Sequence, residues 1–211
     1  MIGESRYISN HLDEIRKEIK STDSNTKAVA LQKLTYINML QGVDMEWAAF
    51  HVIEVMSMTK FEHKKIGYLA ASQSFHEGID VILLATNQIR KDLTSTNEYE
   101  AGVALECLSC IATHDLAQEL TPEVFTLLAS GRLYVRKRAT LVIFKLFAKY
   151  PEAVRIACKR LVEKLEDSDP MVVCAAVCVF CEMALKDPQS CIPLAPEFYK
   201  LLVDSKHNWL T

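Results

Sequence analysis

Glycine and proline are scarce in this sequence, with six of each among 211 residues. That scarcity excludes a collagen-like chain and the low-complexity arrays that depend on those two residues. The composition of a disordered chain is also absent, because half of the residues are hydrophobic and 24% are charged. A chain of this length can bury a substantial core, so we expect a globular protein.

The sequence also lacks the signals of β-structure. No segment alternates regularly between apolar and polar residues, and no Asn-Gly or Asp-Gly hairpin turn occurs. Apolar residues instead recur at helical spacing, as in the stripe Ile8, Leu12, Ile15 and Ile19. We therefore predict about eleven helices, over residues 5–20, 24–40, 45–58, 61–75, 78–91, 98–112, 115–129, 132–148, 152–165, 170–185 and 189–203.

Three short motifs place a capping residue directly before a proline, an arrangement that favours the first turn of a helix. They are Thr121-Pro122, Asp169-Pro170 and Asp187-Pro188. We expect a helix to begin at each of them.

A strong charge of one sign is missing as well. The formal net charge is −3 and the isoelectric point is about 6.1, which does not favour nucleic acid as a partner. The longest apolar run, residues 171–181, is shorter than the roughly 18–20 residues needed to cross a bilayer, so we expect a buried helix there. The first nine residues do not resemble a secretory leader, so we expect the seven cysteines to be reduced thiols in the cytosol.

A repeat runs through every second predicted helix. Small residues stand at Ala30, Gly67, Ala104, Ala139 and Ala176, with spacings of 37, 37, 35 and 37 residues. A small residue at a fixed position lets neighbouring helices approach closely, and apolar residues one turn later fill the space between them. The period and the string from Asp169 to Ala176 predict an all-α fold, a right-handed α-solenoid of HEAT/armadillo-like helical hairpins.

Residues arranged for catalysis or metal binding are not apparent. Cys107 and Cys110 form a CxxC pair, but a zinc site needs further ligands at suitable spacing. These two cysteines and the helical set Cys174, Cys178 and Cys181 are predicted to lie in the core. The glycines are isolated, so no phosphate-binding loop is expected. We predict no catalytic residue, cofactor or metal, and the six scattered histidines leave a Cys–His pair as the open alternative.

Basic residues recur at one position of the repeat. Lys27, Lys64 and Arg136 each stand three residues before the small residue, whereas Ala101 and Val173 interrupt the series. One interpretation is a contact edge for a phosphoinositide membrane or an acidic partner such as a GTPase. The other, which we favour, is that the repeat-position residues bond to the neighbouring repeat. The candidate contact residues are Lys64, Lys65, Arg136, Lys137 and Arg138.

Several stretches resemble the N-terminal trunk of the large adaptins, among them "LTYINMLQGVDMEWAAFHVIEVMS" and "SDPMVVCAAVCVFCEMALKDPQS". The segment Lys64 to Leu69 matches a core that most adaptins share, and its extension, Ala70 to Gly78, looks like the delta class of adaptor-protein complex 3. The resemblance covers essentially the whole chain. It implies that residues 1–211 form a single trunk solenoid, and we expect this to be a fragment truncated at both ends.

The resemblance also implies a function. A large adaptin is a non-enzymatic scaffold in a heterotetramer with a second large (beta-type) adaptin, a medium chain and a small sigma-type chain. Such complexes coat vesicles at Golgi and endosomal membranes, with recruitment by an Arf-family GTPase and phosphoinositides, and carry cargo to lysosomes or vacuoles. The expected location is thus cytoplasmic and peripheral to those membranes. The alternatives are an epsilon-type adaptin of adaptor-protein complex 4, or a general HEAT scaffold such as a nuclear-transport or RNA-binding solenoid.

Overall fold

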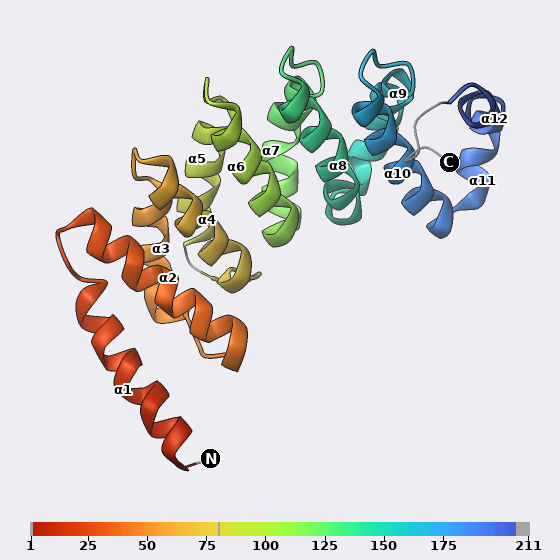
Figure 1. Ribbon diagram of the computed structural model, residues 1–211. Helices are drawn as coiled ribbons and strands as arrows, with labels where there is room; N and C mark the ends of the chain where they lie inside the picture. The colour runs from red at the N-terminus through yellow and green to blue at the C-terminus, as the bar shows by residue number, and fades with distance from the viewer. Residues whose placement is uncertain (1, 80, 206–211) are drawn as a thin grey trace. The chain divides into compact units, whose positions relative to one another are not determined.

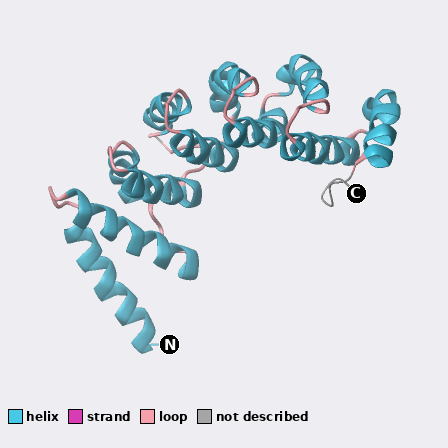
Figure 2. Cartoon of the chain, turned by 45° about the horizontal axis from the view of Figure 1, so that its top comes forward, coloured by secondary structure: helices cyan, strands magenta, loops and turns pink. Residues whose placement is uncertain are grey.

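The computed structural model describes residues 2–79 and 81–205, and the side chains of all of these except residues 2–6 and 154–156. All the regular elements in these ranges are helical (Figures 1 and 2). The α-helices are α1 (Ile2–Glu18), α2 (Ser24–Gln41), α3 (Ala49–Met56), α4 (Phe61–Ser74), α5 (Ile82–Leu93), α6 (Glu98–Ile111), α7 (His114–Leu127), α8 (Leu133–Lys149), α9 (Val154–Lys164), α10 (Pro170–Lys186), α11 (Pro188–Cys191) and α12 (Ala195–Asp204). Short 3₁₀ helices, η1 (Glu46–Ala48), η2 (Pro151–Ala153) and η3 (Ile192–Leu194), precede α3, α9 and α12.

The helices group into two compact units, unit 1 (residues 1–113) and unit 2 (residues 114–211). In unit 1, α2, α4 and α6 pack side by side in one layer, while α3 and α5 form a second layer and α1 packs on α2 (Figure 1). The core between the layers is apolar, with Leu31, Val52 and Leu105 fully buried.

In unit 2, α8 packs along α10, with α7 and α9 against them. Ile143 and Ala176 are fully buried in this core. Near the end of the unit, the Phe180 ring meets the Phe198 ring of α12 edge to face, with 5.6 Å between centroids. Each unit is thus built of helical hairpins stacked in two layers.

The helical-hairpin solenoid predicted from the repeat is confirmed. All five small residues of the repeat are buried: Ala30, Gly67, Ala104, Ala139 and Ala176. Gly67 shows why the position must be small. A Cβ placed on it would lie against the backbone of α3, 2.8 Å from Met56 Cα and from the carbonyl carbon of Val55.

Most predicted helices have a counterpart with similar bounds, but residues 189–203 do not form one helix. That segment is divided into α11, η3 and α12. Pro193 and Pro196 lie within it, and neither has the amide hydrogen that a continuous helix would use. The two prolines account for the division.

The three capping motifs have different outcomes. Asp169 caps α10, because its carboxylate accepts hydrogen bonds from the amides of Met171 (2.9 Å) and Val172 (3.3 Å). Asp187 precedes Pro188 at the start of α11, as predicted. The prediction of a helix start at Thr121-Pro122 is wrong, since Pro122 lies inside α7. The Thr121 hydroxyl donates to the Ala117 carbonyl one turn earlier and is buried within the helix.

Candidate functional site

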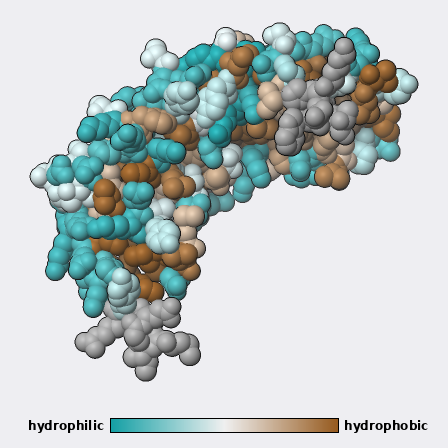
Figure 3. Space-filling view, viewed as in Figure 1, coloured by the Kyte–Doolittle hydropathy of each residue, from teal (hydrophilic) through white to brown (hydrophobic). Residues whose placement is uncertain are grey.

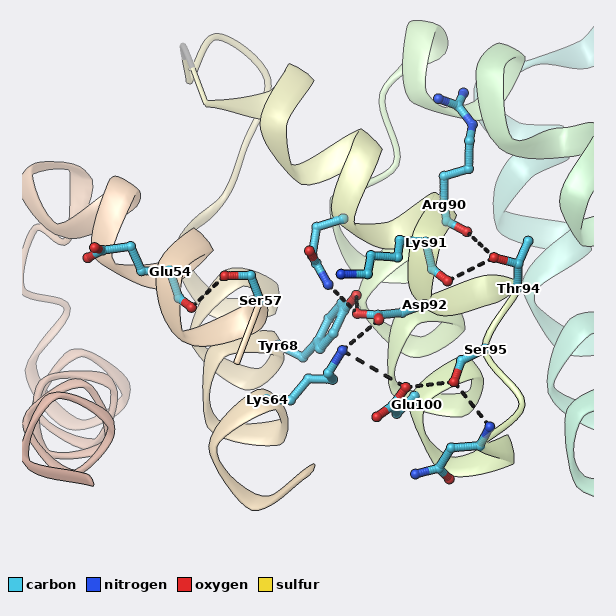
Figure 4. A network of polar contacts seen from close by, with 12 residues as sticks. Glu54, Ser57, Lys64, Tyr68, Arg90, Lys91, Asp92, Thr94, Ser95 and Glu100 are labelled. Atoms are coloured by element: carbon cyan, nitrogen blue, oxygen red, sulfur yellow. Dashed lines mark hydrogen bonds and ion pairs between the residues drawn. The ribbon is translucent and has the colours of Figure 1, made fainter. Parts of the chain in front are cut away.

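The first candidate contact residue, Lys64, is buried rather than displayed. It is only 5% exposed in the first turn of α4, and its Nζ lies 2.6 Å from Asp92 Oδ1 near the end of α5. Asp92 is 2% exposed. An ammonium group held in this way is satisfied inside the molecule and is not available to a ligand (Figure 4).

Asp92 is the centre of a wider polar network (Figure 4). Its Oδ2 accepts hydrogen bonds from the Tyr68 hydroxyl (2.6 Å) and the Gln88 amide (2.8 Å). Burial and the nearby Asp92 carboxylate raise the pKa of Tyr68 well above its usual range, so the phenol stays protonated and remains a donor. Glu100 of α6 extends the network, with its Oε2 4.0 Å from Lys64 Nζ. The network therefore connects α4, α5 and α6.

Lys27 in α2 makes a related contact one repeat earlier. Its Nζ lies 2.9 Å from Glu54 Oε2 in α3, and His51 Nδ1 lies 2.8 Å from the same oxygen. The hydrogen bond from Lys27 lowers the pKa of Glu54 below its ordinary value, and His51 adds to this effect. This pair is more exposed than Lys64–Asp92.

Arg136 occupies the same repeat position in unit 2. It is 9% exposed, its Nη1 donates to the Ser130 carbonyl (2.7 Å), and its Nε lies 2.9 Å from Asp167 Oδ2. Burial alone would raise the pKa of Asp167, but hydrogen bonds from Arg136, the Asp169 amide and Lys164 outweigh it and lower that pKa. Arg136 therefore holds α8 to the segment between α9 and α10.

The interpretation that we favoured from the sequence, bonding between repeats, describes Lys64 and Arg136. The other candidates differ: Lys65 is exposed on unit 1, while Lys137 and Arg138 are half-buried on unit 2. The Arg138 guanidinium lies 5.3 Å from the centroid of the Tyr134 ring, in a cation–π contact.

Sequence reasoning missed the acidic partners of the repeated basic residues. Glu54, Asp92 and Asp167 follow Lys27, Lys64 and Arg136 by 27, 28 and 31 residues respectively. These spacings are shorter than the repeat period and differ from pair to pair, so the repeat position of the basic residues did not reveal their acidic partners.

The cysteines are only partly in the core. Cys107 and Cys174 are buried as predicted, whereas the prediction is wrong for Cys110, Cys178 and Cys181, which are exposed. Cys110 lies three positions from the buried Cys107, and Cys178 and Cys181 lie four and seven positions from the buried Cys174. These spacings share one side of a helix, so helical spacing alone did not distinguish the buried thiols from the exposed ones. Burial raises the pKa of the Cys107 thiol to about 12. Within the described residues, no group of three or more His, Cys, Asp or Glu side chains could hold a metal ion.

An apolar surface lies on the face of unit 1 formed by α1, α2 and α4. One hollow of about 600 Å³ lies between α2 and α4, and a second of about 520 Å³ lies between α1 and α2. Figure 3 shows hydrophobic side chains among hydrophilic ones on the side of unit 1 that carries α2. We call this face the α2 surface; its exposed apolar residues are Tyr7, Val29, Tyr36, Met39, Leu40 and Leu69.

Stacked hairpins tied by ion pairs between successive repeats define a helical-repeat protein. Residues 4–211 match the family model described as "Adaptin N terminal region", and the chain belongs to the adaptin family. No helix in the described part of the chain has the length and apolar character required to span a membrane.

Relatives of known name agree with this family. The chain is 60% identical over its full length to "AP-3 complex subunit delta" of Arabidopsis thaliana and 54% identical over 98% of its length to "AP-3 complex subunit delta-1" of Bos taurus. The Saccharomyces cerevisiae delta subunit is 45% identical over 97% of the chain. The chain spans 24%, 17% and 22% of the lengths of these three relatives.

Other known structures are similar in fold. A chain in a homology model of the full-length AP-3 complex, in an intermediate open conformation, matches 89% of this chain with a TM-score of 0.79 and 46% identity; the match covers 33% of that chain. A designed armadillo repeat protein, solved with a (KR)4 peptide, matches 93% of each chain with a TM-score of 0.69 and 19% identity. The second likeness concerns the fold alone and agrees with the armadillo-like repeat.

Proposed function

We propose that this chain is trunk sequence of a delta-type large adaptin, a scaffold subunit of an adaptor complex that coats transport vesicles. The observation that carries the proposal is 43–60% identity, along nearly the whole chain, to AP-3 delta subunits of plants, animals and fungi. In this role the chain supports intracellular protein transport from Golgi and endosomal membranes to lysosomes or vacuoles.

The role is mechanical and involves no chemistry on a substrate. The charged groups that a catalytic site could use, Lys64, Asp92 and Arg136, hold neighbouring helices together. A stack tied in this way is suited to present surfaces to partner proteins.

The partners belong to the same proposal. They are a small sigma-type chain, a beta-type large adaptin and a medium chain, with an Arf-family GTPase and a phosphoinositide membrane as the means of recruitment. The complex would act in the cytoplasm at the surface of Golgi and endosomal membranes. Lys137 and Arg138 remain candidates for membrane or GTPase contact because neither is fully buried.

Another type of adaptin is less favoured. The gamma-1 subunit of the AP-1 complex from Mycosarcoma maydis is 25% identical to this chain, well below the values for delta subunits. An epsilon-type assignment and a general HEAT scaffold for nuclear transport or RNA find no comparable support.

Copurification tests the proposal. The full-length protein, tagged, should be coexpressed with the other three subunits of the AP-3 complex and, separately, with those of the AP-4 complex. We expect one stable heterotetramer with the AP-3 set, with the mass measured by light scattering after size-exclusion chromatography. Assembly with the AP-4 set alone would overturn the delta assignment, and assembly with neither set would overturn the proposed function.

A further inference from the structure

Three sulfur-containing residues line one hollow of unit 2. The hollow has a volume of about 300 Å³ and lies between α8, α9, α10 and α11. Its walls include Cys158 of α9, Met183 of α10 and Cys191 of α11. Because each of the three comes from a different helix, a ligand held by all of them would tie those helices together.

The two thiols are close enough to influence each other. A negative charge on Cys191 would raise the pKa of Cys158, in addition to the larger effect of burial. Cys191 is only 9% exposed, and its Sγ lies 4.0 Å from the Phe180 carbonyl oxygen and 3.8 Å from the Ser190 hydroxyl. Both contacts are weak because sulfur is a poor donor and acceptor, so they leave the Cys191 sulfur able to bind a ligand.

Oxidation of this pair to a disulfide is less favoured than ligand binding. Only a thiolate attacks an oxidant quickly, and burial raises the pKa of Cys158 above its ordinary value. Cysteines that sense oxidants have low pKa values and are open to solvent. Cys158 is instead half-buried and Cys191 is buried, so the pair lacks the reactivity of a redox switch.

The donor atoms indicate which ligand the hollow could hold. Thiolate and thioether groups favour soft ions such as Cu(I), whereas a structural zinc site takes four ligands, and the described walls contain no histidine. Two thiolates around one Cu(I) ion carry an excess negative charge. Lys186 lines the same hollow, with its Nζ 4.8 Å from the centroid of the Phe144 ring, and its positive charge offsets that excess. Asp187 also borders the hollow, but it is exposed.

We propose that Cys158, Met183 and Cys191 form a binding site for a soft monovalent metal ion, Cu(I), which ties α9, α10 and α11 together. On binding, the two thiols release their protons to solvent and the sulfur atoms donate electron pairs to the ion, whose oxidation state does not change. The site goes beyond the proposed scaffold function and does not depend on it. An ion that binds only the folded protein also stabilises that fold.

Copper retention by the full-length protein tests the site. Cu(I) is added without oxygen, and excess bicinchoninate then removes weakly bound ions. Cys158→Ser and Cys191→Ser keep the side-chain size but replace soft sulfur with a hard hydroxyl, so each should retain one copper ion fewer per chain than wild type. Met183→Leu should weaken retention severalfold. The matched controls, Cys110→Ser and Cys181→Ser, replace exposed thiols outside the hollow and should retain as much copper as wild type.

A second measurement needs no variant. In the wild-type protein, copper should protect Cys158 and Cys191 from prolonged alkylation by N-ethylmaleimide, while Cys110 is labelled as before; peptide mass spectrometry separates these sites. Cys158 labelled equally with and without copper would overturn the inference, as would equal copper retention by all variants or an equal loss in Cys181→Ser. A disulfide between Cys158 and Cys191, trapped by acid and alkylation in cells, would assign the pair to redox chemistry and overturn the inference too.

Discussion

At the scale of single residues, the buried ion pairs determine which charges have a structural role. Lys64 and Asp92 would each pay a large desolvation cost if left alone in the core, and only mutual contact and further hydrogen bonds offset that cost. Asp92 has three donors around it, namely Lys64, Tyr68 and Gln88. The basic half of the pair was predictable from the repeat. The acidic half was not, because the spacing between partners varies with loop length.

Replacement of the buried lysine should reveal this cost. Lys64→Met keeps much of the side-chain volume but leaves the Asp92 carboxylate without its cation, so we expect a loss of about 3–5 kcal/mol in the free energy of unfolding. Lys65→Met, one residue away and exposed, should change that free energy by less than about 0.5 kcal/mol. Urea titration followed by circular dichroism measures both. Equal midpoints for the two variants would show that Lys64 is not an internal tie.

A methyl group at Gly67 should be poorly tolerated. Its Cβ would meet the backbone of Met56 and Val55, which cannot move aside like a flexible side chain. Gly67→Ala should therefore destabilise the fold by about 1–3 kcal/mol, the usual cost of overpacking. Gly131→Ala is the matched control, because no atom lies within 4 Å of a Cβ at that position. Coincident thermal melts of Gly67→Ala and Gly131→Ala would contradict the close approach of α4 to α3.

At the scale of helices, apolar periodicity predicted which helices exist better than it predicted where they begin and end. Asp169 fulfilled its predicted capping role because its carboxylate reaches two free amides. Thr121-Pro122 has the same local pattern, yet the apolar residues Leu116, Leu120 and Val124 are buried along one face through the proline, and packing carries α7 past it. The local helix-start signal therefore did not interrupt α7, because the buried apolar face of the helix continues through it.

The ion pair between Arg136 of α8 and Asp167, in the segment between α9 and α10, should make the free energy of unfolding depend on pH. Its pKa is lowered in the folded protein, so its deprotonated form stabilises the fold. This contribution is complete above the unfolded pKa, about 3.9, and is lost as the pH falls through the lower native pKa. Asp167→Asn should thus be less stable than wild type at neutral pH, and the difference should shrink below roughly pH 4.

Urea midpoints measured from neutral to acid pH test this response. Glu166→Gln is the control, since Glu166 is an exposed carboxylate next to Asp167. It should follow the wild-type curve. A constant stability difference between Asp167→Asn and wild type at all pH values would mean that the charge of Asp167 does not contribute.

Thiol accessibility reports on helix orientation. Cys107 is fully buried, with a pKa raised to about 12, whereas Cys110 on the same helix is exposed. Only a thiolate reacts quickly with iodoacetamide. Native labelling at neutral pH should therefore modify Cys110 and leave Cys107 unmodified until the chain is unfolded in urea. Peptide mass spectrometry separates the two sites, and rapid native labelling of Cys107 would contradict the orientation of α6.

At the scale of the whole molecule, the repeat period was sufficient to predict a helical solenoid, but not which surfaces it would expose. Tyr36, Met39 and Leu40 look like core residues in a sequence, because apolar periodicity does not distinguish a face that packs on the next helix from one that is exposed. The sequence likewise left two interpretations of the basic positions, a contact edge or a bond to the neighbouring repeat. Their role depends on whether an acidic residue of the following hairpin comes within reach.

Charge reversal in unit 2 separates the two roles of basic residues in the full-length protein. Arg136→Glu should lower the melting temperature markedly, because it places a carboxylate against Asp167 in a part-buried site. Lys137→Glu and Arg138→Glu, at half-buried neighbouring positions, should melt closer to wild type.

If these two residues contact the membrane, each reversal should weaken flotation with phosphoinositide-containing vesicles about fivefold or more at low salt, since one basic residue contributes about 1 kcal/mol there. Raising the salt should reduce the difference, because screening weakens exposed charges first. Unchanged flotation of both variants would remove Lys137 and Arg138 from membrane recruitment, and an unchanged melt of Arg136→Glu would remove Arg136 from the joint between repeats.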